Sequence, residues 1–262
     1  MHGPVPHVGG AVMTLTFTVS PDFNTKYLPG WFVFNTWLQR HLGVPTHFEV
    51  FDGFDELHRA MAADSIDIIY ANPFDAARLV RDHGYVAVAR PVGRPDEAVI
   101  ATHEGSAIHA VEDLLPGTRI ATTDDPDVHM MCMIMIEPAD LNSGNVAMFR
   151  RDNYVLVAKS LLKNEADIGF FLAETFDDLS GPIRSQLRVL VRSQIYVINH
   201  LLLAHPRLGA QIDQLRGHLL QMGNDAKGAM ALQDVAIKAW ESVDQEDVEF
   251  MIDLMVALTV TA

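Results

Sequence analysis

Residues 66–77 read IDIIYANPFDAA, an apolar run that ends at Tyr70 and a helical segment that begins at Pro73. A short run of this kind is typical of a strand that is buried on both faces of a parallel sheet. Strand and helix alternate on both sides of it, with strands expected at 15–20, 47–51 and 85–92 and helices at 31–42, 55–63 and 73–82. This order predicts an open α/β sheet.

A second α/β unit follows the first. Strands are expected at 98–102, 119–122, 167–172 and 187–192, with helices at 107–115, 127–137 and 154–164. A strand at 196–205 and helices at 206–222, 226–232 and 245–258 complete the chain. Because the chain must cross out near residue 92 and return near residue 192, we predict that the second unit is inserted into the first. Residues 14–92 and 193–262 then form one lobe and residues 93–192 the other, after a disordered leader at 1–13.

Composition excludes several classes of protein. The 262 residues include 34 acidic and 19 basic side chains, for a formal net charge of −15. Nucleic acids and anionic membrane surfaces are recognised through Lys and Arg, so neither is an expected partner. No window offers the roughly 18 uncharged apolar residues of a membrane span, so direct membrane insertion is not expected. The single cysteine, Cys132, excludes an internal disulfide.

The sequence carries no motif that requires an enzyme. It contains no G-x-S-x-G, no P-loop and no G-x-G-x-x-G. The first 13 residues have neither a basic segment nor a long apolar segment, so they are not a secretory signal as they stand. Mature exported proteins have lost that signal, so we expect a periplasmic protein and keep the cytoplasm as the alternative.

Four stretches stand in a characteristic order: TVSPDFNTKYL at 18–28, DIIYANPFDAA at 67–77, the segment 154–179 that contains NEADIGFF, and LRVLVRSQIYVINHLLLAHPRL at 187–208. Together they resemble the phosphonate- and phosphite-type substrate-binding proteins of ABC importers, a branch of the type-2 periplasmic binding proteins. The resemblance implies two lobes, each a mixed sheet flanked by helices, a two-strand hinge, a ligand held between the lobes and no catalysis. We expect the protein to deliver its ligand to a membrane permease, with a sensor or a metalloenzyme as alternative partners.

The sequence departs from this family at the helix that follows a strand of the second lobe. The family begins this helix with hydroxyl side chains and free N–H groups that bind phosphoryl oxygens, whereas residues 122–137 read TTDDPDVHMMCMIMIE. Asp125 suits the N-cap and Pro126 the first helical position, so Asp124, Asp125 and Asp127 occupy the place where an anion would dock. Because like charges repel, we expect a metal ion or a neutral or cationic molecule rather than a simple phosphonate.

The same helix carries soft ligand atoms. His129, Cys132 and Met133 share one helix face, and with Met130 and with His200 from the return strand they form the predicted metal site. Imidazole, thiol and thioether together favour copper. The competing interpretation is core packing, because a helix that is apolar all round is a buried helix and methionine fills gaps in cores. A metal-dependent enzyme that uses His129 and His200 is the alternative function.

The other candidate residues lie at strand ends, where open α/β sheets bind their ligands. Several have an ordinary structural role as an alternative, since Asn72 and Asn153 are suited to cap helices and one of the two phenylalanines at 170–171 must face the core. The predicted ligand-binding residues are Phe23, Tyr27, Tyr70, Asn72, Asp127, His129, Asn153, Phe171, Glu174, Tyr196 and His200.

Overall fold

A computed structural model describes residues 14–261 of the chain; the predicted leader, residues 1–13, lies outside the described residues. The strands of the first sheet are β1 (Leu15–Val19), β2 (Thr46–Phe48), β3 (Ile68–Ala71), β4 (Val86–Pro91), β10 (Leu201–Ala204) and β11 (Trp240–Glu241). The helices around it are η1 (Thr25–Tyr27), α1 (Leu28–Leu42), α2 (Phe54–Ala62), α3 (Pro73–His83), η4 (Pro206–Leu208), α8 (Gln211–Leu220), η5 (Met222–Asn224), α9 (Ala226–Asp234) and α10 (Gln245–Thr261).

The second sheet is built from residues that lie between β4 and β10 in the sequence. Its strands are β5 (Ala98–His103), β6 (Arg119–Thr122), β7 (Ala147–Arg150), β8 (Ile168–Leu172) and β9 (Leu187–Arg192). Its helices are η2 (Val111–Asp113), α4 (Pro126–Ile136), η3 (Glu137–Ala139), α5 (Tyr154–Leu162), α6 (Ala173–Asp177) and α7 (Gly181–Arg184).

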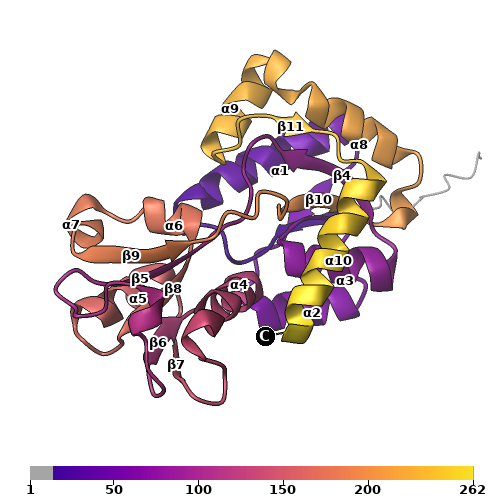
Figure 1. Ribbon diagram of the computed structural model, residues 1–262. Coiled ribbons are helices and arrows are strands. Elements are labelled where there is room, and N and C mark those ends of the chain that lie inside the picture. Colours follow the sequence, from indigo (N-terminus) through magenta and orange to yellow (C-terminus); the bar gives the residue numbers. More distant parts are fainter. Residues whose placement is uncertain (1–13, 262) are drawn as a thin grey trace, which may run out of the picture.

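Each sheet is mixed and forms the centre of one lobe (Figure 1). The strand order is β11-β4-β10-β3-β1-β2 in the first lobe and β7-β6-β8-β5-β9 in the second. Strand β3 pairs in parallel with β1 and antiparallel with β10, which returns from the second lobe. All four residues of β3 are buried, as its apolar run predicts. The structure is therefore the two-lobed α/β fold expected from the sequence.

Equivalent aspartates anchor one strand of each lobe. Asp67 precedes β3 and accepts a hydrogen bond from the Thr16 N–H of β1 at 2.7 Å. Asp167 precedes β8 and accepts one from the Arg119 N–H of β6 at 2.8 Å. Each carboxylate also pairs with a guanidinium, Asp67 with Arg207 at 2.6 Å and Asp167 with Arg119 at 2.7 Å. These charge-assisted bonds fix β3 against β1 and β8 against β6. The opposite ends of β3 and β8 face the other lobe.

Helix α4 lies where the two lobes meet. It packs on β5 and β8 of its own sheet and contacts α3 and α10 of the first lobe. Cys132 and the methionines at 130, 131 and 133 are at most 4% exposed. The helix is apolar on every side because both lobes cover it, which agrees with the core-packing interpretation of its methionines.

The structure corrects several element boundaries. The strand predicted at 196–205 begins only at Leu201, because the Ile195 and Tyr196 N–H groups donate to Glu97 Oε1, at 2.8 Å each, instead of joining a ladder. The helix predicted at 107–115 is reduced to η2, and the one predicted at 206–222 is divided into η4, α8 and η5. Strands β7 and β11 were not predicted, since both are short edge strands without a strong apolar pattern.

Candidate functional site

A cavity of about 30 Å³ lies between the lobes. Its walls come from the segment after β1, from the end of β3, from the two segments that join the sheets, and from the end of β8 with α6. This volume holds about two water molecules. The lining residues are Asp22, Phe23, Asn24, Tyr27, Trp31, Tyr70, Arg94, Asp96, Leu172, Glu174, Thr175, His200 and Val235.

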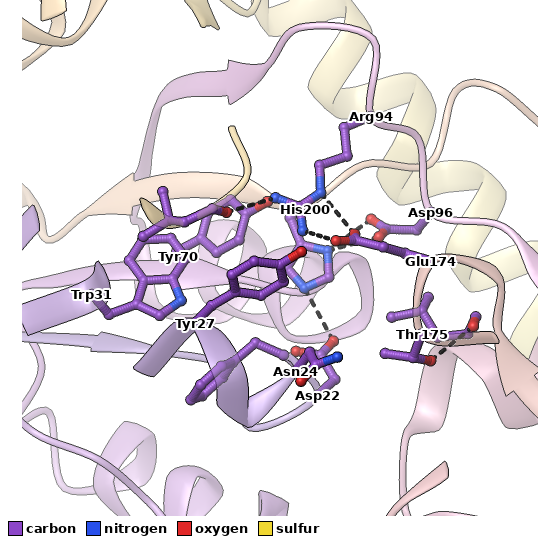
Figure 2. A pocket seen from close by; sticks show the side chains of 13 residues that line it. Asp22, Asn24, Tyr27, Trp31, Tyr70, Arg94, Asp96, Glu174, Thr175 and His200 are labelled. Carbon is purple, nitrogen blue, oxygen red and sulfur yellow. Dashed lines mark hydrogen bonds and ion pairs between the residues drawn. The ribbon is translucent and has the colours of Figure 1, made fainter. Parts of the chain in front are cut away.

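A buried histidine in the wall of this cavity lies between two carboxylates. Figure 2 shows His200 with Asp22 on one side, 3.0 Å from Nε2, and Asp96 on the other, 2.8 Å from Nδ1. Although burial favours the neutral ring, the carboxylates of Asp96 and Asp22 raise the pKa of His200 well above its usual value. His200 is thus an imidazolium that donates to both residues.

Aromatic rings form one wall of the cavity (Figure 2). The Tyr70 ring stacks on His200 with 4.9 Å between centroids, and Trp31 lies 5.2 Å from Tyr70. Burial raises the pKa of Tyr70 to about 12, so its hydroxyl stays protonated at neutral pH. A protonated imidazole above a ring face is a favourable cation–π arrangement.

Two ion pairs lie beside the cavity, and the second of them joins the two lobes. Arg94, on the segment that leaves β4, donates from Nε to Glu174 of α6 at 2.7 Å. Lys26 of η1 reaches Asp178, just beyond α6, at 2.5 Å. Although burial opposes it, the Tyr70 hydroxyl and the Glu174 carboxylate raise the pKa of Arg94, which remains charged. The Lys26–Asp178 pair and the hydrogen bonds from Arg94 to the carbonyl oxygens of residues 235 and 236 link the two lobes.

Beside the cavity, three carboxylates converge from the two lobes. Asp22 follows β1, whereas Asp125 and Asp127 begin α4, and one oxygen from each lies within 4.8 Å of the others. Asp22 is 8% exposed and the other two are 2% exposed. We refer to these three residues as the carboxylate cluster. Asp124, which was expected beside them, is exposed and does not belong to it.

Backbone and side-chain donors orient the second-lobe members of the cluster. Asp125 caps α4, because its Oδ1 accepts from the N–H groups of Asp127 and Val128 at 3.1 and 3.2 Å. Its Oδ2 accepts from the Tyr154 hydroxyl at 2.7 Å. Asp127 Oδ1 accepts from the Phe74 N–H of α3 at 2.9 Å, a bond that crosses between the lobes.

The cluster is electrostatically strained when nothing positive lies within it. Burial raises the pKa of Asp125 to about 7, and the nearby Asp22 carboxylate adds to the shift. Burial and the Asp125 carboxylate likewise raise the pKa of Asp127 well above its usual range. A cation placed among these oxygens would relieve both desolvation and repulsion.

The structure brings some of the predicted ligand-binding residues together. Phe23, Tyr27, Tyr70, Glu174 and His200 line the cavity, and Asp127 belongs to the carboxylate cluster beside it.

The others lie elsewhere. Asn72 caps α3 and Asn153 caps α5, which are their structural alternatives. Phe171 packs in the core against Phe176, with ring centroids 5.2 Å apart. Tyr196 is 65% exposed, because the segment 193–200 crosses between the lobes as irregular chain and points this side chain outward. His129 lines a second cavity.

The predicted copper site is not assembled. His129 and Met130 line a separate cavity of about 380 Å³, whereas His200 is held by two aspartates. Cys132 is fully buried, with its Sγ 4.0 Å from the Val99 carbonyl oxygen, and it does not line the cavity of His129 and Met130. Met133 is buried in the core between the lobes. Within the described part of the chain, the carboxylate cluster is the only group of three or more His, Cys, Asp or Glu side chains that converges, and all its donor atoms are oxygens.

We expect Cys132 to be unreactive in the native protein. It is fully buried, and its high pKa leaves no thiolate to attack a disulfide reagent. Titration with Ellman's reagent should therefore label no thiol under native conditions and one thiol per chain in denaturant. Stoichiometric labelling of the folded protein would show that the α4 region opens readily.

Sequence patterns did not predict three charged residues of the cavity, Asp22, Arg94 and Asp96. Asp22 lies shortly after the end of β1, within the stretch that carries the family resemblance, so its position was a usable signal. Arg94 and Asp96 lie on an irregular segment with no motif around them. Their roles depend on contacts with residues far along the chain, Asp96 with His200 and Arg94 with Glu174.

Two lobes joined by two crossing segments, with a charged cavity between them, define a solute-binding protein of the periplasmic type. Residues 17–248 match the model of a family described as the periplasmic substrate-binding proteins of phosphonate ABC transporters, and the chain belongs to this family. The family consists of substrate-binding proteins, so the enzyme alternative is set aside. Membership implies a small-molecule ligand and a membrane permease as partners. No helix in residues 14–261 is long and apolar enough to cross a membrane.

Solved structures share the fold at low sequence identity. PhnD1 from Prochlorococcus marinus, in complex with methylphosphonate, has 13% identity and a TM-score of 0.79 over 94% of this chain and 98% of its own. A binding protein component of an ABC phosphonate transporter from Pseudomonas aeruginosa has 17% identity and a TM-score of 0.78 over 95% and 88%. The alkanesulfonate-binding protein SsuA from Xanthomonas axonopodis pv. citri, bound to MOPS, has 15% identity and a TM-score of 0.62 over 94% and 93%. No curated protein matches the chain.

Proposed function

We propose that this chain is the binding protein of an ABC importer whose cargo carries positive charge, and that simple phosphonates are not its cargo. The observation that supports this proposal is the carboxylate cluster at the N-terminus of α4, Asp22, Asp125 and Asp127. A helix N-terminus ordinarily attracts an anion through its free N–H groups. Here the protein supplies its own anion, because the Asp125 carboxylate accepts from two of those N–H groups.

The remaining charges around the cavity favour the same cargo. Asp22, Asp96 and Glu174 are acidic, whereas the two cationic groups that line the cavity with them, Arg94 and His200, are already paired with these carboxylates. An oxyanion would have to displace one of these pairs and approach a buried carboxylate. Both steps cost free energy in a site of low dielectric.

We further propose that cargo binding drives closure of the lobes. Residues 14–92 and 193–262 form the first lobe and residues 93–192 the second, with the segments 92–97 and 193–200 as the hinge. Asp22 belongs to the first lobe, and Asp125 and Asp127 to the second. A cation that contacts all three stabilises only the closed state, which is how a ligand shifts such an equilibrium.

A thermal-shift panel tests this function. At about 100 times its Kd a cationic ligand should raise the Tm by about 5–10 °C, while methylphosphonate and phosphite should leave it unchanged. The panel should hold methylammonium, guanidinium and divalent metal ions beside these oxyanions and a neutral amide. Trp31 lines the cavity, so its fluorescence gives a second signal. A rise with methylphosphonate and with no cation would overturn the proposal.

A further inference from the structure

Two members of the carboxylate cluster each hold one oxygen fixed and leave the other free. Asp127 Oδ1 accepts from the Phe74 N–H, and Asp22 Oδ2 pairs with His200 Nε2. The second oxygen of each carboxylate, Asp127 Oδ2 and Asp22 Oδ1, is buried and has no hydrogen-bond partner among the residues that the structure describes. The fixed oxygen restrains the carboxylate, and the second oxygen stays available to a ligand.

A buried carboxylate oxygen without a partner costs several kcal/mol unless something positive is supplied. His200 cannot supply it, because its two ring nitrogens already contact Asp22 Oδ2 and Asp96. The Arg94 guanidinium is held by Glu174 and by the carbonyl oxygens of residues 235 and 236. A cation supplied from outside the chain would satisfy both oxygens.

The donor set determines which kind of cation fits. All three side chains offer carboxylate oxygens, which are the ligands of hard cations, and none offers sulfur or imidazole. An ion that lies about 2.0–2.6 Å from each oxygen holds two oxygens no more than about 5 Å apart. The cluster spans at most 4.8 Å. One ion at its centre therefore reaches all three residues with little movement of the chain.

The small volume of the cavity and the number of carboxylates beside it also favour a small, highly charged ion. The cavity against Asp22 has a volume of only about 30 Å³, which accommodates waters of hydration but not the body of an organic amine. The three carboxylates of the cluster meet beside this cavity, and the neighbouring imidazolium of His200 is shared with Asp96. A divalent ion offsets this excess of negative charge better than a monovalent ion does.

On the basis of the proposed function, we infer that the cargo is a hard divalent cation of the Ca²⁺, Mn²⁺ or Mg²⁺ type, bound by the carboxylates of Asp22, Asp125 and Asp127. Three ligands come from the protein and the remaining positions are filled by water. The Tyr154 hydroxyl and the Phe74 N–H orient the carboxylates from behind. Because the first lobe contributes one ligand and the second lobe two, the ion bridges the lobes.

Calorimetry on the full chain, after dialysis against a chelator, tests the inference with CaCl₂, MnCl₂ and MgCl₂ as separate titrants. One ion per chain is expected for at least one of the three metals. Asp127→Asn and Asp22→Asn should each weaken binding at least about tenfold, the size of effect that even outer partners of a metal site have. Asp124→Asn is the matched control, since Asp124 lies on the same turn but is exposed and outside the cluster. It should bind like the wild type.

Each outcome separates the two proposals. Binding of methylammonium without binding of any divalent ion overturns the inference and leaves the proposed function standing. Binding of methylphosphonate alone overturns both. If Asp127→Asn, Asp22→Asn and Asp124→Asn all bind the divalent ion equally well, the ion binds outside the carboxylate cluster and the inference is overturned. The Tm of each variant without ligand shows whether it is folded, and Mn²⁺ electron paramagnetic resonance reports binding independently of heat.

Discussion

Gly30→Ala is expected to lower the free energy of unfolding by about 3 kcal/mol, or the Tm by roughly 6–12 °C. A Cβ at Gly30 would lie 2.3 Å from the Asp234 carbonyl oxygen and 2.6 Å from its carbonyl carbon. Both atoms belong to the backbone at the end of α9, so no side-chain rotation relieves the clash. Helix α1 would have to move away from α9, and Trp31, which lines the cavity, would move with it.

Gly217→Ala is the matched control for this prediction. Gly217 lies within α8, and a Cβ there meets nothing within 4 Å. Alanine has the higher helix propensity, so this variant should be stabilised by about 1 kcal/mol. Thermal unfolding of both variants measures the contrast in sign. If Gly30→Ala melts at or above the wild-type temperature, the close approach of α1 and α9 does not exist in solution.

His200→Gln is expected to destabilise the protein by about 3–5 kcal/mol, the usual effect of removing one partner from a buried ion pair. The substitution removes the positive charge that lies between Asp22 and Asp96, whose side chains are 3% and 10% exposed. Two carboxylates would then be buried beside each other without a counterion. Denaturant unfolding of the unliganded protein measures the loss, since m-values and midpoints separate stability from compactness.

Two further variants make this prediction specific. Adding Asp96→Asn to His200→Gln removes one of the orphaned charges and should recover part of the lost stability, because contacting residues are not additive. His47→Gln is the surface control, since His47 pairs with Glu49 at 2.8 Å but both side chains are exposed. Its effect should be within about 0.5 kcal/mol. Equal losses in His200→Gln and His47→Gln would contradict a buried imidazolium.

The family resemblance, together with the acidic start of α4, raised from the sequence alone the question of whether the ligand is an anion. Asp125 as N-cap, Pro126 as first helical residue and Asp127 in the first turn are all observed. Such features depend on residues only a few positions apart, so a single sequence reveals them. The structure gives the copper interpretation of the same helix no support, because a pattern of soft residues does not say which of them face the cleft and which the core.

The sequence by itself determined the α/β class, the order of most strands and helices, the doubly buried strand β3 and the acidic start of α4, because periodicity and capping act over short distances. Only the tertiary structure decided which charges meet. Asp22 and Asp96 reach His200 from 178 and 104 residues away in the chain. Hydrogen bonds and ion pairs at such separations depend on how the two lobes close, and no local pattern of residues encodes that geometry.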